Sequence, residues 1–152
     1  MISIRSYLCN KRGEEFHEIC NGSDYLVQDD NYIDGAIELT INGVSIVDRT
    51  MWDTIDDLWA YIANMIDDLC KFGRAQTLFP DQPIKLSFER TGKDQVRVTS
   101  YFGDIVKTAV VGEVELVSAL TMAGVQFFRE MMRINPASSQ AYQHQVERLR
   151  SY

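Results

Sequence analysis

The chain has 152 residues, of which 45% are hydrophobic and 24% charged, with a net charge of −7 at pH 7 and a pI near 4.8. This composition is typical of a globular chain long enough for one well-packed core, so we expect a single domain over residues 1–152. Only 15 residues are Lys or Arg and none form a run, which argues against nucleic-acid binding through phosphate neutralisation. No signal-peptide pattern and no apolar stretch of the ~18 residues in a membrane span are present, so we expect a cytoplasmic protein.

Two weak alternating patterns near the N-terminus predict strands at residues 2–8 and 15–20. A stronger pattern covers residues 36–41, where apolar and polar side chains alternate before Asn42-Gly43 and a second apolar run at 44–47. Asn-Gly between two such runs is typical of a type I′ turn, in which both central residues need positive φ. The pattern therefore predicts a β-hairpin here.

A long amphipathic helix is predicted from Thr50 to Phe72. Thr50 has an N-cap side chain, Asp53 stands at the capping-box position, and Gly73 is a typical C-terminal stop. At 100° per residue one arc is apolar and consists of Trp52, Ile55, Trp59, Ile62, Ile66 and Leu69. The opposite arc is mostly acidic and consists of Asp53, Asp56, Asp57, Asn64, Asp67 and Asp68.

Strands are again predicted after the link Phe79–Pro83, because each proline disfavours helical geometry in the residue before it. Residues 84–89 alternate, the polar tetrapeptide 91–94 contains a glycine, and alternation resumes at 96–100. We expect a second hairpin, with a possible third strand at 104–111.

Two further helices are expected in the C-terminal third. Gly112 precedes a helical pattern that should end near Asn135, and Pro136 can begin a short helix that runs to about Leu149. The expected fold class is α+β, with a largely antiparallel sheet of hairpins packed by two main amphipathic helices and a short C-terminal helix.

We find no convincing catalytic, cofactor or metal motif. His17 and His144 lack partners at the spacing of a triad or a metal motif, and neither common glycine-rich phosphate loop is present. The three cysteines (Cys9, Cys20, Cys70) are odd in number and form no C-x-x-C pair, which argues against a disulfide framework and a zinc site. Paired aspartates could hold a divalent cation, but the one loop resembling a calcium site has Ile33 where an oxygen ligand is needed. We therefore expect no metal and no cofactor.

The most distinctive feature is a concentration of acid. Residues 21–70 contain eleven acids and one base, Arg49, giving a local charge of −10, while the rest of the chain sums to +3. A solvated face that maintains solubility explains part of this pattern. Repulsion among the aspartates of one helix, with no Lys or Arg between them, also favours the interpretation that this face binds a basic protein, because complementary charge accelerates association.

Two candidate binding surfaces follow from this pattern. The helical stripe contributes Asp53, Asp56 and Asp57, and a preceding loop combines acids with tyrosines, whose rings bury contact area at low entropic cost. The loop candidates are Asp24, Tyr25, Asp29, Asp30, Tyr32 and Asp34. We expect the loop to be the stronger contact, since it offers aromatic area as well as charge.

The helix Trp52 to Leu69, leading through Gly73 into Phe79-Pro80-Asp81-Gln82-Pro83-Ile84, resembles the small bacterial immunity proteins of contact-dependent and polymorphic toxin systems. The resemblance covers roughly residues 35–130 and transfers no residue-level motif. It implies a binding protein that neutralises a cognate toxin, such as a nuclease, by covering its active site or a neighbouring surface. The expected partner is thus a basic toxin domain, and not a nucleic acid or a membrane.

Two other readings stay open. A small enzyme or ligand-binding domain could assemble its site from residues distant in sequence, such as His17, Tyr25, Tyr32 and Glu38. Self-association could use the apolar residues Phe127, Phe128, Met131 and Met132, although burial of this helix in the core is favoured. The expected state is a monomer or a weak homodimer.

Overall fold

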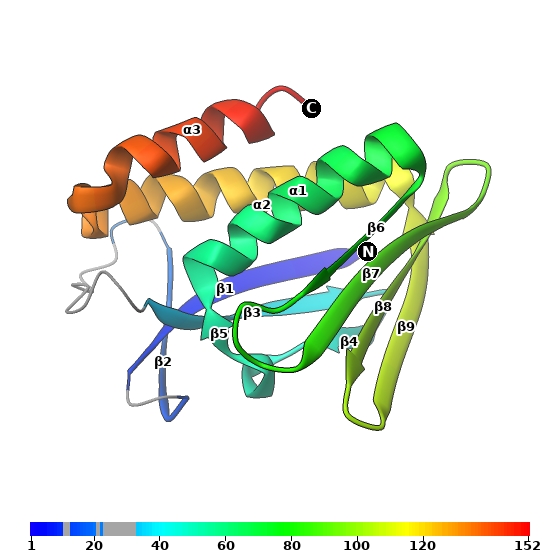
Figure 1. Cartoon of the computed structure of the whole chain (residues 1–152), viewed down its shortest axis with the longest axis horizontal. Helices are drawn as coiled ribbons and strands as arrows, with labels where there is room; N and C mark the ends of the chain where they lie inside the picture. The colour runs from blue at the N-terminus through cyan, green and yellow to red at the C-terminus, as the bar shows by residue number, and fades with distance from the viewer. Residues whose placement is uncertain (11–12, 21, 23–32) are drawn as a thin grey trace.

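The computed structural model describes residues 1–10, 13–20, 22 and 33–152, which form two antiparallel sheets and three α-helices (Figure 1). In the first sheet the strand order is β2-β1-β3-β4, with β5 paired to β3; the strands are β1 (Ile2–Asn10), β2 (Glu15–Glu18), β3 (Asp34–Ile41), β4 (Val44–Val47) and β5 (Asp53–Thr54). In the second sheet the order is β6-β7-β8-β9; the strands are β6 (Arg74–Leu78), β7 (Ile84–Gly92), β8 (Gln95–Phe102) and β9 (Ile105–Gly112). The predicted α+β class with antiparallel strands is confirmed.

The helices pack between and over the two sheets. They are α1 (Ile55–Phe72), α2 (Glu113–Ile134) and α3 (Ser139–Leu149), and two short 3₁₀ turns precede α1 and α3, namely η1 (Arg49–Met51) and η2 (Pro136–Ser138). Helix α1 contacts β6 and β3, α2 contacts β1, and α3 folds back along α2 (Figure 1). The short C-terminal helix is confirmed, with its first residues in the 3₁₀ turn η2.

The first predicted hairpin is confirmed in detail. Strands β3 and β4 are joined by Asn42 and Gly43, whose φ angles are 49° and 85°. Both residues therefore adopt the positive φ that a type I′ turn requires, at little steric cost for Asn and Gly. The hairpin β7–β8 and the third strand, β9, are confirmed as well.

The predicted start of the long helix is wrong by four residues, because the N-cap residue is Thr54 and not Thr50. Thr50 lies in η1, where the side chain of Asp48 accepts a hydrogen bond from the Thr50 N–H, and α1 begins only at Ile55. The predicted end is confirmed, because Gly73 adopts φ 75° and its N–H donates to the Leu69 carbonyl at 2.9 Å. The interval between η1 and α1 is extended strand, which changes the role of Asp53.

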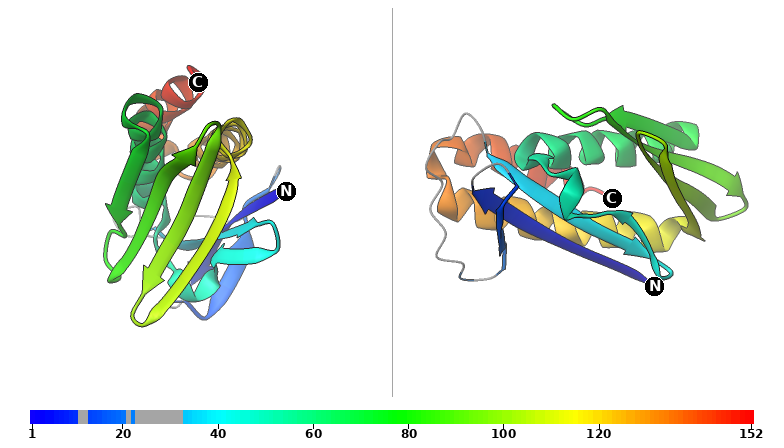
Figure 2. Two further views of the ribbon diagram at one scale, coloured as in Figure 1. Left: turned by 90° about the vertical axis from the view of Figure 1, so that its right-hand side faces the viewer. Right: turned by 90° about the horizontal axis from the view of Figure 1, so that it is seen from below.

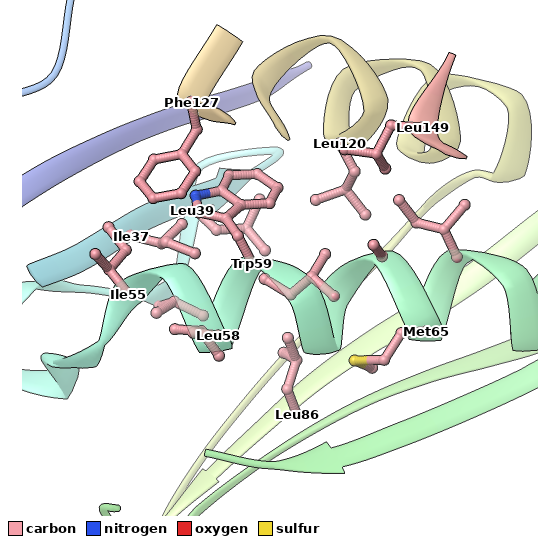
Figure 3. Packing of buried hydrophobic residues seen from close by; sticks show 14 of the residues in the cluster. Ile37, Leu39, Ile55, Leu58, Trp59, Met65, Leu86, Leu120, Phe127 and Leu149 are labelled. Atoms are coloured by element: carbon pink, nitrogen blue, oxygen red, sulfur yellow. The ribbon is translucent and has the colours of Figure 1, made fainter. Parts of the chain in front are cut away.

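The core is centred on Trp59 of α1 (Figure 3). Its ring stacks on Phe127 of α2 at a centroid distance of 5.9 Å, and its indole N–H donates to the Ser6 hydroxyl of β1 at 3.0 Å. Phe127, Phe128 and Met131 are buried, so the favoured core reading is confirmed for these three, while Met132 is half-buried and packs against the core. Trp59 thus connects two helices to the first sheet.

The two sheets differ in how they are covered. In the second sheet Ile84, Leu86 and Phe88 are buried, and α1 packs against β6 and β7. Tyr101 and Val106 lie on the opposite, exposed face, because Tyr101 pairs with Lys85 and with Val106 in the register. The strands of this sheet face the viewer in the left-hand view of Figure 2. In the first sheet β1 lies at the edge for much of its length (Figure 2, right). Among the residues described, no helix is long and apolar enough to cross a lipid bilayer.

Candidate functional site

Asp53 is the structural centre of the acidic region at the start of α1. Its side chain is 1% exposed and accepts hydrogen bonds from three backbone N–H groups: those of Thr54 at 2.7 Å, Asp81 at 3.0 Å and Gln82 at 2.8 Å. A buried carboxylate with several donors is satisfied within the fold. The expectation that Asp53 belongs to an exposed helical stripe is therefore wrong.

The hydrogen bonds of Asp53 bring a fourth aspartate into this region. Asp81 follows Pro80 in the link between β6 and β7, and its carboxylate also accepts a 3.4 Å hydrogen bond from the Thr54 hydroxyl. Asp81 is exposed, and it lies 28 positions from Asp53 in the sequence. We call Asp53, Asp56, Asp57 and Asp81 the acidic cluster.

Asp56 is the second member of the acidic cluster with a structural partner. Its carboxylate accepts a 3.0 Å hydrogen bond from the Tyr142 hydroxyl of α3, which in turn accepts one from the Asn135 side chain at 3.0 Å. Burial raises the pKa of Asp56, although the Tyr142 hydrogen bond opposes that shift. Burial and the Asp56 charge also raise the pKa of Tyr142. Asp56 is therefore half-buried and helps to attach α3 to α1.

Asp57 is the exposed aspartate of the first turn of α1. Partial burial raises its pKa, and the negative charges of Asp56, Asp81 and Asp53 raise it further. In the part of the chain that the structure describes, neither Asp57 nor Asp81 forms an ion pair with a Lys or Arg side chain. The N-terminus of α1 offsets part of this repulsion, because its free N–H groups favour negative charge.

The far end of the predicted stripe is electrostatically different. Asp67 forms an ion pair with Lys71 at 2.9 Å and accepts a 2.8 Å hydrogen bond from the Tyr152 hydroxyl. These hydrogen bonds lower the pKa of Asp67, the reverse of the shift at Asp57. Within the described residues, Asp67 is therefore paired with a cation, whereas Asp57 and the adjacent Asp81 are not.

The last residue of the predicted acidic loop, Asp34, lies near the start of α1. Asp34 begins β3 and is paired with Thr54 in the β3–β5 register, beside Asp53. The other loop candidates lie outside the described residues; they are Asp24, Tyr25, Asp29, Asp30 and Tyr32. Of the predicted loop surface, the structure therefore places Asp34, which lies at the junction of β3 and β5 just before α1.

Of the four residues considered for an enzyme site, Tyr25 and Tyr32 lie outside the described residues, and the other two, His17 and Glu38, do not converge. In the register of the first sheet, His17 lies opposite Leu8 and Glu38 lies opposite Arg5. Because successive side chains of a strand alternate between its faces, Leu8 and Arg5, three positions apart, lie on opposite faces. His17 and Glu38 are therefore separated by the sheet. No group of three His, Cys, Asp or Glu residues suited to a metal ion occurs within residues 1–10, 13–20, 22 and 33–152.

Sequence reasoning missed two residues of this region, Asp81 and Tyr142. The Pro80-Asp81 pair indicates a turn, and an aspartate in a turn commonly interacts with nearby backbone N–H groups, but nothing local names Asp53 as its neighbour. Comparison of the chain with family models, with curated proteins and with solved structures gives no match.

Proposed function

We propose that this protein binds a basic protein partner through the acidic cluster and neutralises it, as an immunity protein neutralises a cognate bacterial toxin. The observation that carries the proposal is the pair of exposed carboxylates, Asp57 and Asp81, that lie beside two further acids without a cationic side chain paired to them among the described residues. Several acids elsewhere are paired with a cation, as in Glu38–Arg49 and Asp48–Lys107.

The elevated pKa of Asp57 gives the acidic cluster a physical reason to bind a cation. Its charged form is disfavoured by partial burial and by three neighbouring negative charges. A Lys or Arg side chain of a partner would offset that repulsion and would remain partly hydrated at the rim of the contact. Such rim charges act mainly on the association rate and on the choice of partner.

The step from a basic partner to a toxin rests on the resemblance of residues 35–130 to immunity proteins. An inhibitor of this kind needs a stable fold and a complementary surface rather than a catalytic set. A nuclease is a suitable target class, since a cleft that binds phosphates is cationic and would attract an acidic cover. Inhibition would follow from occlusion of that cleft or of a surface next to it.

The decisive experiment is a pull-down of the tagged full chain from the producing cell, with mass spectrometry that includes the products of neighbouring genes. We expect one cationic protein in stoichiometric amount, and we expect its toxicity in a test cell to be suppressed by co-expression of this chain. Recovery of no protein above background, or of a partner whose toxicity is unaffected, would contradict the proposal.

Charge variants test the role of the acidic cluster once that partner is isolated. The double variant Asp57→Lys, Asp81→Lys should lower the association rate roughly tenfold at low ionic strength and reduce its salt dependence. Both positions are exposed, unlike Asp53. Asp104→Lys with Glu147→Lys makes the same change in net charge at exposed acids outside the cluster and should have a much smaller effect. Equal slowing by both double variants would assign the attraction to net charge alone.

A further inference from the structure

Strand β1 has an unpaired edge along its first residues. The Ile19 N–H donates to the Ser6 carbonyl at 2.8 Å, so Ser6 directs its backbone groups toward the β2 side of β1. In an antiparallel strand alternate residues direct both groups to the same side, so Ile4 and Ile2 face that side too. Among the described residues β2 is the strand on this side, and its register ends opposite Tyr7. The N–H and C=O groups of Ile2 and Ile4 are therefore available to another strand.

A groove of about 950 Å³ adjoins this edge. Ile2 and Ile4 line it from β1, and Ala119, Met122 and Ala123 line it from α2. Met122 is 71% exposed although it belongs to a core helix. Helix α2 thus presents apolar side chains beside the sheet edge, where an added strand would place its inward-facing residues. The right-hand view of Figure 2 shows β1 at the edge with α2 behind it.

The charge of the groove is opposite to that of the acidic cluster. Arg129 of α2 and Arg150, just after α3, both line the groove, and both are exposed. Neither forms an ion pair within the described part of the chain. Glu130 also lines the groove, but its carboxylate is paired with Arg133 at 3.0 Å. An acidic occupant is therefore favoured over a basic one.

We propose that β1 accepts an extended segment of a partner protein as an additional strand, with apolar residues inward against α2 and acidic residues near Arg129 and Arg150. Backbone hydrogen bonds to Ile2 and Ile4 supply the register, and the groove selects the inward side chains, as in other strand-addition complexes. The segment also covers an edge that would otherwise stay open to non-specific pairing. This surface is distinct from the acidic cluster, so the inference does not depend on the proposed function.

The inference can be tested with a defined peptide and the full chain. The probe is acetyl-Glu-Thr-Val-Thr-Val-Thr-Glu-amide, in which both valines and both glutamates fall on one face of a strand, and the matched control has lysine in place of each glutamate. We expect the glutamate peptide to slow amide hydrogen exchange at Ile4 at least tenfold at saturation and to shift the methyl resonance of Met122, as measured by NMR. The lysine peptide should bind at least fivefold more weakly.

Variants of the groove complete the test. The double variant Arg129→Glu, Arg150→Glu should reverse the preference between the two peptides, and since both side chains are exposed the fold should be retained. Ile4→Pro removes an outward N–H and should weaken both peptides at least fivefold, with circular dichroism confirming the fold. Unchanged exchange at Ile4 in millimolar peptide would overturn the inference, as would equal binding of both peptides. Protection that grows with protein concentration alone would also overturn it and would identify a second copy of the chain as the occupant.

Discussion

At the residue scale, Asp53 shows how a single carboxylate can join distant parts of a chain. Its oxygens accept hydrogen bonds from the N–H group of Thr54, just before α1, and from two N–H groups in the link between β6 and β7. That link contains Pro80 and Pro83 and lies between two strands, so it has few regular backbone partners of its own. The carboxylate therefore substitutes for a strand partner and fixes the position of Asp81.

We predict that Asp53→Ala destabilises the fold by about 2–4 kcal/mol, because three backbone N–H groups lose their acceptor in a buried site. The free energy of unfolding from urea denaturation measures this loss. Asp57→Ala is the matched control at an exposed neighbour and should change stability by about 0.5 kcal/mol or less. Similar losses in the two variants would refute the structural role of Asp53.

The hydroxyl of Tyr142 leads to a prediction about alkaline pH. Tyr142→Phe removes the donor to Asp56 and the acceptor for Asn135, and should cost about 1–2 kcal/mol near neutral pH. Because the folded state raises the pKa of Tyr142, the folded protein retains this proton more tightly than the unfolded chain does. The resulting stability is present below the ordinary tyrosine pKa of about 10 and is lost as pH rises above it.

Thermal unfolding of the wild type and of Tyr142→Phe between pH 8 and pH 11 tests this predicted loss of stability at alkaline pH. The wild type should lose melting temperature faster than Tyr142→Phe above about pH 10, so that the difference between them narrows. The other tyrosines titrate in both proteins and cancel in the comparison. Parallel curves across the range would contradict the assignment.

At the element scale, the strongest sequence predictions are those whose causes are local. Asn42-Gly43 predicts its hairpin because positive φ is a property of those two residues, and Gly73 ends α1 for the same reason. The apolar positions of α1 are also correct from Ile55 to Leu69, all buried in the core. Local propensity and burial pattern agree in these elements.

The features that sequence reasoning missed depend on contacts across the chain. Strand β6 is short and comes directly after α1, and it is defined by its register with β7 rather than by a clear alternation of its own. The division of the strands into two sheets likewise depends on the position of α1 between them. In the sequence Asp53 stands at the capping-box position after Thr50, but in the structure it belongs to β5 and forms long-range hydrogen bonds. The candidate site was therefore predictable in its charge but not in its geometry.

Gly124 offers a prediction about how the three helices meet. A Cβ atom at this position would lie 2.8 Å from Leu149 Cδ1 and 3.2 Å from Trp59 Cζ3, so α1 and α3 approach α2 closely here. In an exposed helix Gly→Ala stabilises by about 1 kcal/mol, but here we expect Gly124→Ala to destabilise by about 1 kcal/mol.

A double-mutant cycle separates the higher helix propensity of alanine from the steric cost of its contact with Leu149. In the Leu149→Ala background the nearer obstacle is absent, so Gly124→Ala should become neutral or stabilising, with a coupling of about 1–2 kcal/mol. Unfolding free energies of the four proteins provide the measurement. The same effect of Gly124→Ala in both backgrounds would show that packing against Leu149 does not limit this position.

At the scale of the whole molecule, charge is distributed unevenly. The acidic cluster is concentrated at the start of α1, whereas the groove beside β1 carries Arg129 and Arg150, which form no ion pair with another described residue. With a net charge of −7, such a molecule will orient in the field of a charged partner before contact. The two surfaces favour partners, or parts of one partner, of opposite sign.

Screening should stabilise this fold. Raising NaCl from 0.02 to 0.2 M shortens the Debye length from about 20 to about 7 Å and weakens repulsion within the acidic cluster. We expect the free energy of unfolding to increase by a few tenths of a kcal/mol, measured by urea denaturation at pH 7. For the double variant Asp57→Asn, Asp81→Asn, the same increase in salt should raise the free energy of unfolding by less than it does for the wild type. An equal gain would place the relevant repulsion elsewhere in the molecule.

The placement of the two tryptophans supplies a built-in optical reporter. Trp59 is enclosed by the core, so its emission should report only on global unfolding. Trp52 is partly exposed, directly precedes Asp53, and its carbonyl accepts a hydrogen bond from the Gln82 side chain. A Trp52→Phe variant retains only Trp59, whose emission should not change on binding. A Trp59→Phe variant retains only Trp52, whose emission should respond to a partner. Titration of any candidate partner could thus be followed without a label, with the change in emission arising at the start of α1.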